Sequence, residues 1–412
     1  MNEQKKLFII GSVWPEPNSS AAGSRMIQII EQFQQNGWSI TFGSIAGDSN
    51  FSVDLKEMGI QKVSLKLNDE SFDSFVKELN PAIVLFDRFM TEEQFGWRVA
   101  EQCSDAIRIL DTEDLHCLRE GRRKAWIDSR EFSQDDLMTD IARREIASIF
   151  RCDLSLIISK YEMKLLTDFF NVDESLLLYL PFMLDPIDES MIKKWPDFNS
   201  RKHFISIGNF LHQPNWNAVF YLKEEIWPKI RAKLPEAELH IYGAYSSTKV
   251  EQLHKPEKGF MVKGRAEDAK AVMKNARILL APLRFGAGLK GKLIEAMQCG
   301  TPTVTTSVGA EAMHGEYDWS GFVEDRSDDF VESAIKLYTI ENVWTEAQSK
   351  GETIINNLYS KSEFGEAFLE RVSKLWSNIE EHRKKNFIGS MLMHHSMAST
   401  KFMSRWIEEK NK

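Results

Sequence analysis

The stretch RFGAGLKGKLIEAMQCGTP, residues Arg284–Pro302, follows an apolar run and leads into a predicted helix. Gly286, four further residues, Gly291 and Lys292 match the start of the phosphate-loop pattern G-x-x-x-x-G-K-[ST]. The next residue is Leu293, where a phosphate-loop enzyme needs a hydroxyl group for magnesium. The stretch is therefore either a damaged nucleotide triphosphatase loop or a different way of holding phosphate.

The helix that is predicted to begin near Lys290 favours the second interpretation. A helix N-terminus offers free N–H groups and a positive dipole end to a phosphate, and Lys290 and Lys292 add positive charge there. Glu295 lies one turn further on, and its carboxylate can accept two hydroxyl hydrogen bonds, such as those of a ribose. Leu293 and Met297, four residues apart, can face the core. The alternative is a plain junction between a loop and a helix, with solvated lysines.

The composition excludes several classes of protein. The chain has 412 residues, enough for two or three domains, and its net charge of -9 argues against a nucleic-acid binder. The four cysteines lie far apart without a C-x-x-C pair, so we expect reduced core thiols rather than disulfides or a zinc site. They are Cys103, Cys117, Cys152 and Cys299.

No apolar run is long enough to suggest a membrane span, and the short run after Lys5 and Lys6 resembles a buried strand more than a signal peptide. We therefore expect a cytoplasmic protein.

Short apolar runs alternate with longer amphipathic stretches along most of the chain. The apolar runs are continuous rather than alternating, which predicts parallel strands covered on both faces. We expect an α/β fold with two Rossmann-like, doubly wound domains facing across a cleft. Ser133 and Asp136 are predicted to cap a helix over 137–150, and a second helix is predicted over 214–234. The expected organisation is a first domain at 1–185, a proline-containing linker at 186–200, a second domain at 201–360 and a C-terminal segment at 361–412.

Ligands of such sheets bind in loops beyond the carboxyl ends of the strands. Gly208 and Asn209 follow a predicted strand there and precede a helix, which suits a phosphate or a sugar, although a turn glycine explains them as well. Gly23 ends a long loop after the first strand and could bring backbone N–H groups to the cleft. Arg25 could contact phosphate or a surface carboxylate.

Three carboxylates and a histidine follow the strand predicted over 106–111. A metal site from Asp111, Asp114 and His116 is conceivable, but the spacing matches no ligand pattern. His116 alone is either structural or catalytic.

Several motifs together carry a family resemblance. They are AAGSR at 21–25, IGNFLHQPNWNAV at 207–219, YGAY at 242–245, VKGR at 262–265 and PLRFGAGLKGKLIEAMQCGTPTVTT at 282–306. The chain resembles the retaining, family-4-like glycosyltransferases of the GT-B fold (glycosyl transferases group 1), most specifically between His203 and Met313.

The resemblance implies a set of donor-binding residues. In that family two glutamates, separated by seven residues, hold the donor, and Glu295 matches the second one, which binds the ribose. Ala287 stands where the first would be, as in a GAGLK variant of the motif. By the same resemblance Lys290, Lys292 and Arg265 would bind the leaving diphosphate, Gly208 and Asn209 would face the phosphates, and Gly23 would lie near the donor. His116 would lie near the transferred sugar, which makes His116 and Lys290 the implied catalytic residues.

The implied activity is transfer of a sugar from a nucleotide-diphosphate sugar to a glycan, lipid-linked or protein-linked acceptor, as in polysaccharide biosynthesis. Front-face attack would need neither a metal, a cofactor nor a protein nucleophile. Three alternatives stay open. One is a non-catalytic nucleotide-sugar-binding relative, the second is an epimerase or phosphorylase on the same fold, and the third is a phosphate-loop NTPase.

The end of the chain predicts a helix from Ser360 to Lys385, which in the resembled family returns to the first domain. Beyond it lies a locally basic tail with an apolar stripe at helical spacing. Such a stripe is typical of a helix on the inner surface of a membrane or of a tail packed on its own protein, and we favour packing. The stripe comprises Ile388, Met391, Leu392, Ala398, Phe402 and Trp406.

Overall fold

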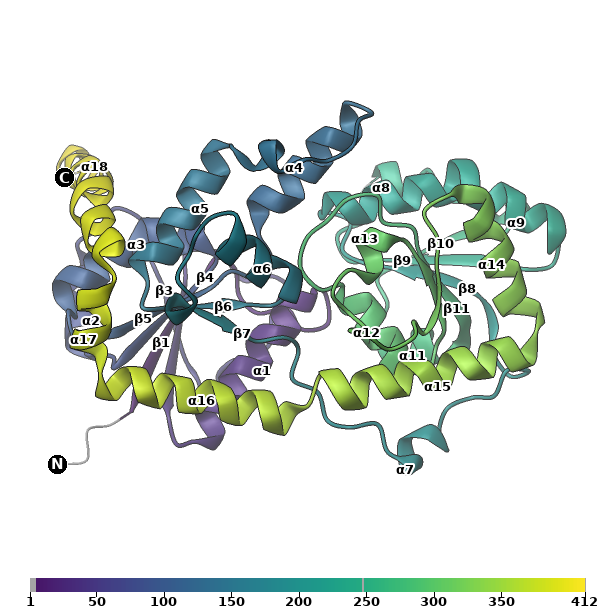
Figure 1. The fold of residues 1–412 in the computed structure, drawn as a ribbon, viewed down its shortest axis with the longest axis horizontal. Coiled ribbons are helices and arrows are strands. Elements are labelled where there is room, and N and C mark those ends of the chain that lie inside the picture. Colours follow the sequence, from purple (N-terminus) through teal and green to yellow (C-terminus); the bar gives the residue numbers. More distant parts are fainter. Residues whose placement is uncertain (1–4, 247, 412) are drawn as a thin grey trace.

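The computed structural model describes residues 5–246 and 248–411, and these contain two parallel β-sheets, one in each half of the chain (Figure 1). The strand order is β3-β2-β1-β4-β5-β6-β7 in the first sheet and β10-β9-β8-β11-β12-β13 in the second. Each sheet starts in its middle, grows to one edge and then to the other, which is the doubly wound topology. The expected fold, two Rossmann-like domains in a GT-B architecture, is therefore confirmed.

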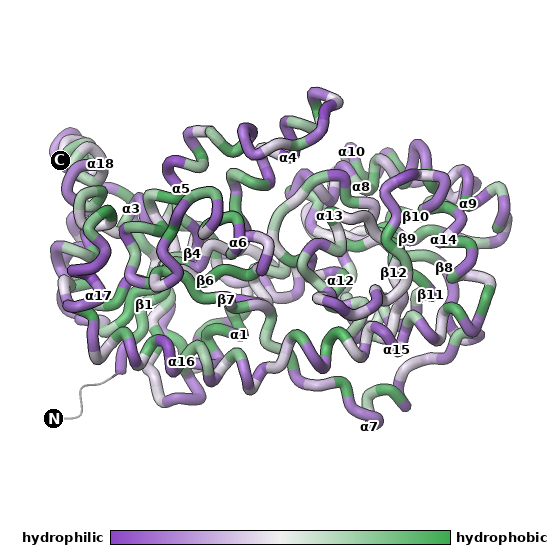
Figure 2. Tube along the Cα trace, viewed as in Figure 1, coloured by the Kyte–Doolittle hydropathy of each residue, from purple (hydrophilic) through white to green (hydrophobic). Residues whose placement is uncertain are grey.

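The strands of both sheets are mostly buried because their apolar runs are covered by helices on both faces. In Figure 2 the central strands are green, whereas the helices around them alternate between purple and green. The first sheet consists of β1 (Lys6–Gly11), β2 (Ser39–Ser44), β3 (Gln61–Ser64), β4 (Ile83–Asp87), β5 (Ile107–Asp111), β6 (Leu154–Ile157) and β7 (Leu177–Tyr179). The second consists of β8 (Lys202–Ile207), β9 (Leu239–Tyr242), β10 (Phe260–Gly264), β11 (Ala276–Ala281), β12 (Thr303–Thr305) and β13 (Gly321–Val323).

One helix of the first domain begins later than predicted. Ser133 and Asp136 do form a capping box, but it opens only a short 3-10 turn, Gln134–Leu137. Thr139 then caps a separate helix, α5, because its side chain accepts a hydrogen bond from the N–H of Ala142. The helices here are α1 (Ala21–Gln35), α2 (Ser71–Leu79), α3 (Phe89–Gln102), α4 (His116–Ile127), α5 (Asp140–Arg151) and α6 (Lys160–Asp168).

The helix that was predicted over 214–234 is present and widens in its middle. A π-helical turn, Leu222–Ile226, joins α8 to α9 just before Pro228, which has no N–H group to continue the ordinary pattern. The helices of the second half are α8 (Gln213–Tyr221), α9 (Trp227–Lys233), α10 (Thr248–Glu251), α11 (Ala269–Asn275), α12 (Gly291–Gln298), α13 (Ser307–Ala310), α14 (Ser327–Thr339) and α15 (Glu341–Leu358).

The chain passes twice between the domains at one place. On the way out it runs through the segment that contains α7 (Glu189–Ile192), and it returns between α15 and α16 (Lys361–Ser377) (Figure 1). The N–H of Leu184 donates to the carbonyl of Tyr359 at 2.7 Å, so the two passages lie side by side. Phe368 of α16 packs edge-on against Phe33 of α1, with ring centroids 5.4 Å apart. The returning helix is therefore part of the core of the first domain.

The tail packs on the first domain, but not through its apolar stripe. After α17 (Ile379–Lys385), the long helix α18 (Phe387–Asn411) lies against α3 and α5. Arg98 of α3 is buried and donates to Ser404 and Glu408 of α18. By contrast, members of the stripe are exposed, with Ile388 at 48%, Phe402 at 69% and Trp406 at 58%. Our assignment of the stripe to the packed face was wrong. The packed face of α18 carries Ser404 and Glu408 instead, because the buried guanidinium of Arg98 requires polar partners.

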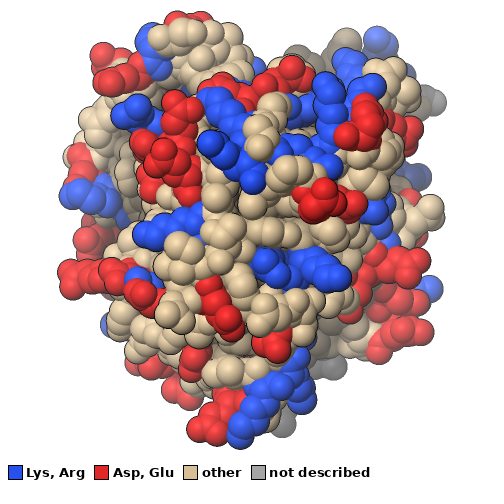
Figure 3. All heavy atoms as spheres, turned by 90° about the vertical axis from the view of Figure 1, so that its right-hand side faces the viewer, with Lys and Arg blue, Asp and Glu red and all other residues tan. Residues whose placement is uncertain are grey.

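The surface carries both charge signs. On the face of the second domain that Figure 3 shows, lysine and arginine side chains are interrupted by aspartate and glutamate.

Candidate active site

A cleft of about 1030 Å³ lies between the two domains, where the carboxyl ends of both sets of strands face each other. Its size suits a ligand with several ring systems rather than a single ion. Most of the residues proposed from the sequence line it, and they come from loops that are far apart along the chain. They are His116, Gly208, Asn209, Arg265, Lys290, Lys292 and Glu295.

Two helix N-termini approach each other in this cleft. Helix α1 of the first domain begins at Ala21 after its cap Ser20, and α12 of the second domain begins at Gly291. A Cβ atom on Gly291 would lie 2.5 Å from the Cβ of Ala21, so the two helices meet closely only because residue 291 is a glycine. The positive ends of two helix dipoles therefore point at one place, which favours an anion there.

Two lysines stand at this place. Lys290 is the N-cap residue of α12, is buried, and donates from Nζ to the carbonyl of Gly288 at 2.7 Å. Lys292 donates from Nζ to Oδ1 of Asn215 at 2.8 Å. Burial lowers the pKa of each lysine to about 8, because water no longer stabilises the charged form. Both stay protonated at neutral pH and have no carboxylate within ion-pair distance among the described residues, so an anionic ligand would be bound strongly.

Gly208 is needed for the position of Lys292. A Cβ atom at residue 208 would lie 2.7 Å from Nζ of Lys292 and 2.7 Å from Nδ2 of Asn215. The neighbouring Asn209 fixes the loop, because its carbonyl accepts a hydrogen bond from Nδ2 of Asn215 at 3.0 Å. The absent side chain at residue 208 therefore makes room for a cation.

Glu295 and Arg265 lie further along the same wall of the cleft. Burial raises the pKa of Glu295, while Lys270 and Lys292 oppose that rise. The guanidinium of Arg265 lies over the ring of Phe51, which belongs to the first domain, at 4.5 Å from the ring centroid. These two side chains can recognise the hydroxyl groups and the base of a nucleoside.

His116 opens helix α4 on the opposite side of the cleft. Its ring packs edge-on against Phe89, and Nε2 lies 3.7 Å from Oδ1 of Asp114. Burial lowers the pKa of His116 to about 4, so the imidazole is neutral at pH 7. A neutral imidazole can donate one hydrogen bond and accept another, which suits sugar hydroxyl groups.

The comparisons with known proteins agree with this geometry. Residues 201–339 match the family model of the glycosyl transferases group 1. The chain is a glycosyltransferase. No curated protein matches the sequence.

Solved structures show the same fold over nearly the whole glycosyltransferase. Sucrose-phosphate synthase from Thermosynechococcus elongatus superimposes with a TM-score of 0.67 at 13% identity, covering 90% of this chain and 99% of that one. Anabaena HepE in complex with UDP-glucose gives 0.66 at 13% identity, covering 90% and 100%. TarM gives 0.69 at 10% identity, covering 90% and 99%. At these identities the likeness establishes the architecture.

Gly23 lies beside the cleft of the glycosyltransferase rather than in its lining. It is buried in the first turn of α1, where a Cβ atom would lie 2.5 Å from the carbonyl carbon of Glu16. It borders a smaller neighbouring pocket of about 200 Å³. The helix begins before Gly23, so Ser20 and Ala22 face the cleft near the place that we had assigned to the glycine.

In two places carboxylates pair with arginines, and the expectation for Arg25 was wrong for this reason. Arg25 contacts neither phosphate nor a surface carboxylate, since it is fully buried and bonded to Asp111 and to the carbonyl of Leu180. The hypothetical metal site is not assembled either, because Asp111 is bound by Arg25 and Asp114 by Arg119.

Arg88 of the cleft was missed by the sequence analysis, and Glu113 was noticed only as one of three carboxylates near the end of a strand. Arg88 follows β4 and Glu113 follows β5, and both have a left-handed backbone, with φ of 71° and 61°. Nη1 of Arg88 donates to the hydroxyl of Ser12 at 2.6 Å. Oε1 of Glu113 is buried without a hydrogen-bond partner, and burial raises the pKa of this carboxyl well above its ordinary value. Strained backbones of this kind concentrate at functional sites, and no sequence pattern revealed them.

The glycine-rich loop after β11 is fastened to the first domain. Arg122 of α4 donates to the carbonyl of Gly286 at 3.0 Å and pairs with Glu311 at 2.6 Å. Glu162 of α6 accepts a hydrogen bond from the N–H of Gly288 at 2.9 Å. These contacts across the domains hold Lys290 at its place, and no sequence pattern indicated them.

Proposed function

We propose that the protein transfers a sugar from a nucleotide-diphosphate sugar to an acceptor hydroxyl, with retention of the anomeric configuration and without a divalent metal. The observation that carries the proposal is the meeting of the N-termini of α1 and α12 next to Lys290 and Lys292. During the transfer, negative charge develops on the departing diphosphate. Fixed dipoles and buried cations aimed at that charge stabilise the transition state more than the ground state.

The donor is assigned along the wall of the second domain. The diphosphate lies between the two helix N-termini, Glu295 binds the ribose hydroxyl groups, and Arg265 lies towards the base. The complexes of HepE with UDP and with glucose, on the same fold, make UDP-glucose the first donor to test.

The acceptor side is assigned to the first domain. Neutral His116 hydrogen-bonds a hydroxyl group of the transferred sugar, and Arg88 and Glu113 face the acceptor. In a front-face reaction the donor phosphate accepts the proton of the acceptor, so the protein has to supply positions rather than a nucleophile.

The charges that the chain itself provides support the proposed metal independence. Lys290, Lys292 and two helix dipoles supply the positive charge that Mg²⁺ provides in a phosphate-loop NTPase. Leu293, which takes the place of the hydroxyl residue, is fully buried in the core. It belongs to the packing of α12.

Nucleotide release separates this proposal from its alternatives. We would incubate the protein with UDP-, GDP- and ADP-sugars, with and without EDTA, and measure the released nucleoside diphosphate. We expect slow release that EDTA does not change and that Lys290→Ala and Glu295→Ala reduce strongly. Lys233→Ala, which changes an exposed lysine at the end of α9, serves as the matched control.

Other outcomes would support other functions. Binding of the nucleotide sugar without turnover would favour a non-catalytic relative, since Ala287 replaces a donor-binding glutamate. A change in the configuration of the donor sugar without its release would indicate an epimerase. Magnesium-dependent ATP hydrolysis would overturn the proposal.

A lipid-linked acceptor at an anionic membrane surface is the acceptor class that the tail favours. None of the described helices has both the length and the apolar character needed to cross a membrane. However, α18 turns Phe387, Phe402 and Trp406 to the solvent, and the exposed Lys384 and Lys385 stand at its start. An apolar face with adjacent cations matches an interface rich in anionic lipids.

Vesicle sedimentation tests this contact. We expect the protein to sediment with vesicles that contain phosphatidylglycerol and to stay in solution with phosphatidylcholine alone. The double variant Phe402→Ser with Trp406→Ser should lose the binding. Equal sedimentation of the double variant would contradict the lipid contact.

A further inference from the structure

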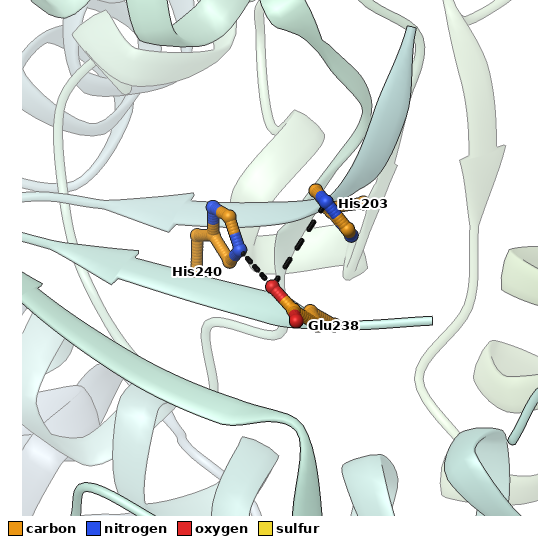
Figure 4. Close-up of side chains that lie close together, drawn as sticks. All are labelled: His203, Glu238 and His240. Atoms are coloured by element: carbon orange, nitrogen blue, oxygen red, sulfur yellow. Dashed lines mark hydrogen bonds and ion pairs between the residues drawn. The ribbon is translucent and has the colours of Figure 1, made fainter. Parts of the chain in front are cut away.

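A cluster of two histidines and a glutamate lies at the edge of the second sheet that is opposite to the cleft. His203 is at the start of β8, and Glu238 and His240 are at the start of β9 (Figure 4). The cleft is at the other ends of these strands, where Gly208 follows β8. At about 3.3 Å per residue, the five steps from His203 to Gly208 correspond to roughly 17 Å. The cluster is therefore separate from the transfer reaction.

The geometry of the cluster is close to that of a metal site. Nε2 of His240 lies 2.7 Å from Oε2 of Glu238, and Nε2 of His203 lies 3.9 Å from the same oxygen. One ligand atom from each of the three residues lies within 4.8 Å of the others. Ligand atoms about 2.1 Å from a tetrahedral zinc ion are about 3.4 Å apart, so small rotations of the side chains would close the site.

The position of His203 is unfavourable in two ways. Its backbone is left-handed, with a φ of 61°, which is uncommon for a residue with a side chain. Its Nδ1 atom is buried and has no hydrogen-bond partner among the described residues. The ring nevertheless stacks on His240, with the centroids 4.6 Å apart. Within the described part of the chain, neither ring nitrogen of His203 is committed to a hydrogen bond within 3.5 Å, so the ring can turn one of them to a metal ion.

We propose that His203, Glu238 and His240 bind a divalent transition-metal ion, with Zn²⁺ as the representative. Imidazole nitrogens with one carboxylate are ligands of zinc, copper and nickel rather than of calcium or magnesium. The side chains are 19% to 37% exposed, so the ion can enter and a water molecule can complete the coordination. The ion would join the starts of β8 and β9.

The positive charges around the cluster narrow the kinds of ion that it would bind. The positive charges of Lys202 and Lys263 act on His203, and Lys263 also acts on Glu238. They oppose any cation, which further disfavours ions that bind imidazole weakly. Removal of one of these charges should therefore strengthen binding of the metal.

Zinc binding to the purified full-length chain, measured by competition with a chromophoric indicator, tests the proposal. We expect one zinc ion per chain, and a thermal midpoint that rises when zinc is added. His240→Gln and Glu238→Gln should each weaken the binding by more than about 100-fold, since even an outer-shell partner is worth about 10–100-fold. His203→Asn is the third variant, because asparagine tolerates the left-handed backbone. Lys263→Gln should bind zinc more tightly than the unaltered chain.

The control is the double variant His394→Ala with His395→Ala, which removes two exposed neighbouring histidines of the tail. It should bind zinc as the unaltered chain does. Loss of binding in this variant, or unchanged binding in His240→Gln, would overturn the proposal. A chain that binds no zinc would show that the cluster is only a hydrogen-bonded surface pair. Release of nucleotide from the donor is measured separately, so a failure of the transfer reaction would not affect the interpretation of zinc binding.

Discussion

Replacement of Lys290 by methionine should make the enzyme more stable and much less active. Lys290 is buried at the start of α12, and burial lowers its pKa from the ordinary 10.5 to about 8. At 1.36 kcal/mol per pKa unit, that difference corresponds to about 3 kcal/mol. The free energy of unfolding is lower by this amount whenever the lysine is charged in both the folded and the unfolded state. Methionine fills a similar volume without the charge, but it cannot donate to the carbonyl of Gly288, a loss of about 1 kcal/mol.

The net gain of about 2 kcal/mol would raise the thermal midpoint by about 4–8 °C for a domain of this size. The lowered pKa also determines how this gain in stability changes with pH. The disadvantage of the charged lysine is fully present below pH 8. It fades as the pH rises from there to 10.5, because only the unfolded chain then binds the proton. The advantage of Lys290→Met should therefore be roughly halved near pH 9.

The same substitution removes the cation that we propose to face the leaving diphosphate. Loss of one preorganised group of this kind costs about 10²–10³-fold in kcat. We expect kcat to fall more than KM rises, because the charge of the diphosphate grows in the transition state.

Scanning calorimetry at pH 7 and pH 9, together with steady-state release of nucleotide, measures both effects. Lys233→Met should change neither, because this lysine is exposed. A lower thermal midpoint for Lys290→Met at pH 7 would refute the reasoning, since Lys290 would then belong to a stabilising ion-pair network. An activity within threefold of the unaltered enzyme would refute its assigned role.

Three further predictions follow from single contacts. Gly208→Ala should weaken binding of UDP by about tenfold or more in calorimetric titrations, about 1.4 kcal/mol, because the new Cβ atom would lie 2.7 Å from Nζ of Lys292. Binding of UDP, measured across pH, should be constant between pH 6.5 and 7.5. It should fall above pH 8 by up to about tenfold per unit for each lysine, since Lys290 and Lys292 then lose their protons in the empty cleft. Glu408→Ala should destabilise the first domain by about 2–4 kcal/mol in urea, because it removes a partner of a buried arginine, whereas Phe402→Ser should leave the stability unchanged. Equal effects of these last two substitutions would show that the outer face of α18 is packed in solution.

The sequence was informative wherever the function depends on neighbours along the chain. The continuous apolar runs predicted parallel strands, and parallel strands place their carboxyl ends at one edge. Lys290, Lys292 and Glu295 lie within two turns of one helix, so their convergence could be read directly. Gly208 and Asn209 were found because a strand end and a helix start leave a recognisable pattern.

Sequence patterns failed wherever a residue's partner lies far along the chain. The apolar stripe of α18 was recognised, but its direction was not, because periodicity defines a face and not what covers it. Arg25 was expected to contact either phosphate or a surface carboxylate, and only the packing of α1 on the sheet brings it to Asp111. Gly23 was expected in the cleft, and only the path of the loop at Glu16 explains why a glycine is needed there.

The sequence by itself determined the two doubly wound domains and the cationic helix start that lines the cleft, because both arise from local periodicity and short-range order. The tertiary structure alone decided how the site is completed. Arg122 and Glu162 fasten the glycine-rich loop across the cleft, and Arg88 and Glu113 are strained into it. Such contacts join residues that lie far apart in the sequence, so no local pattern predicts them. The free energy that holds these residues together comes from burial of the whole domain.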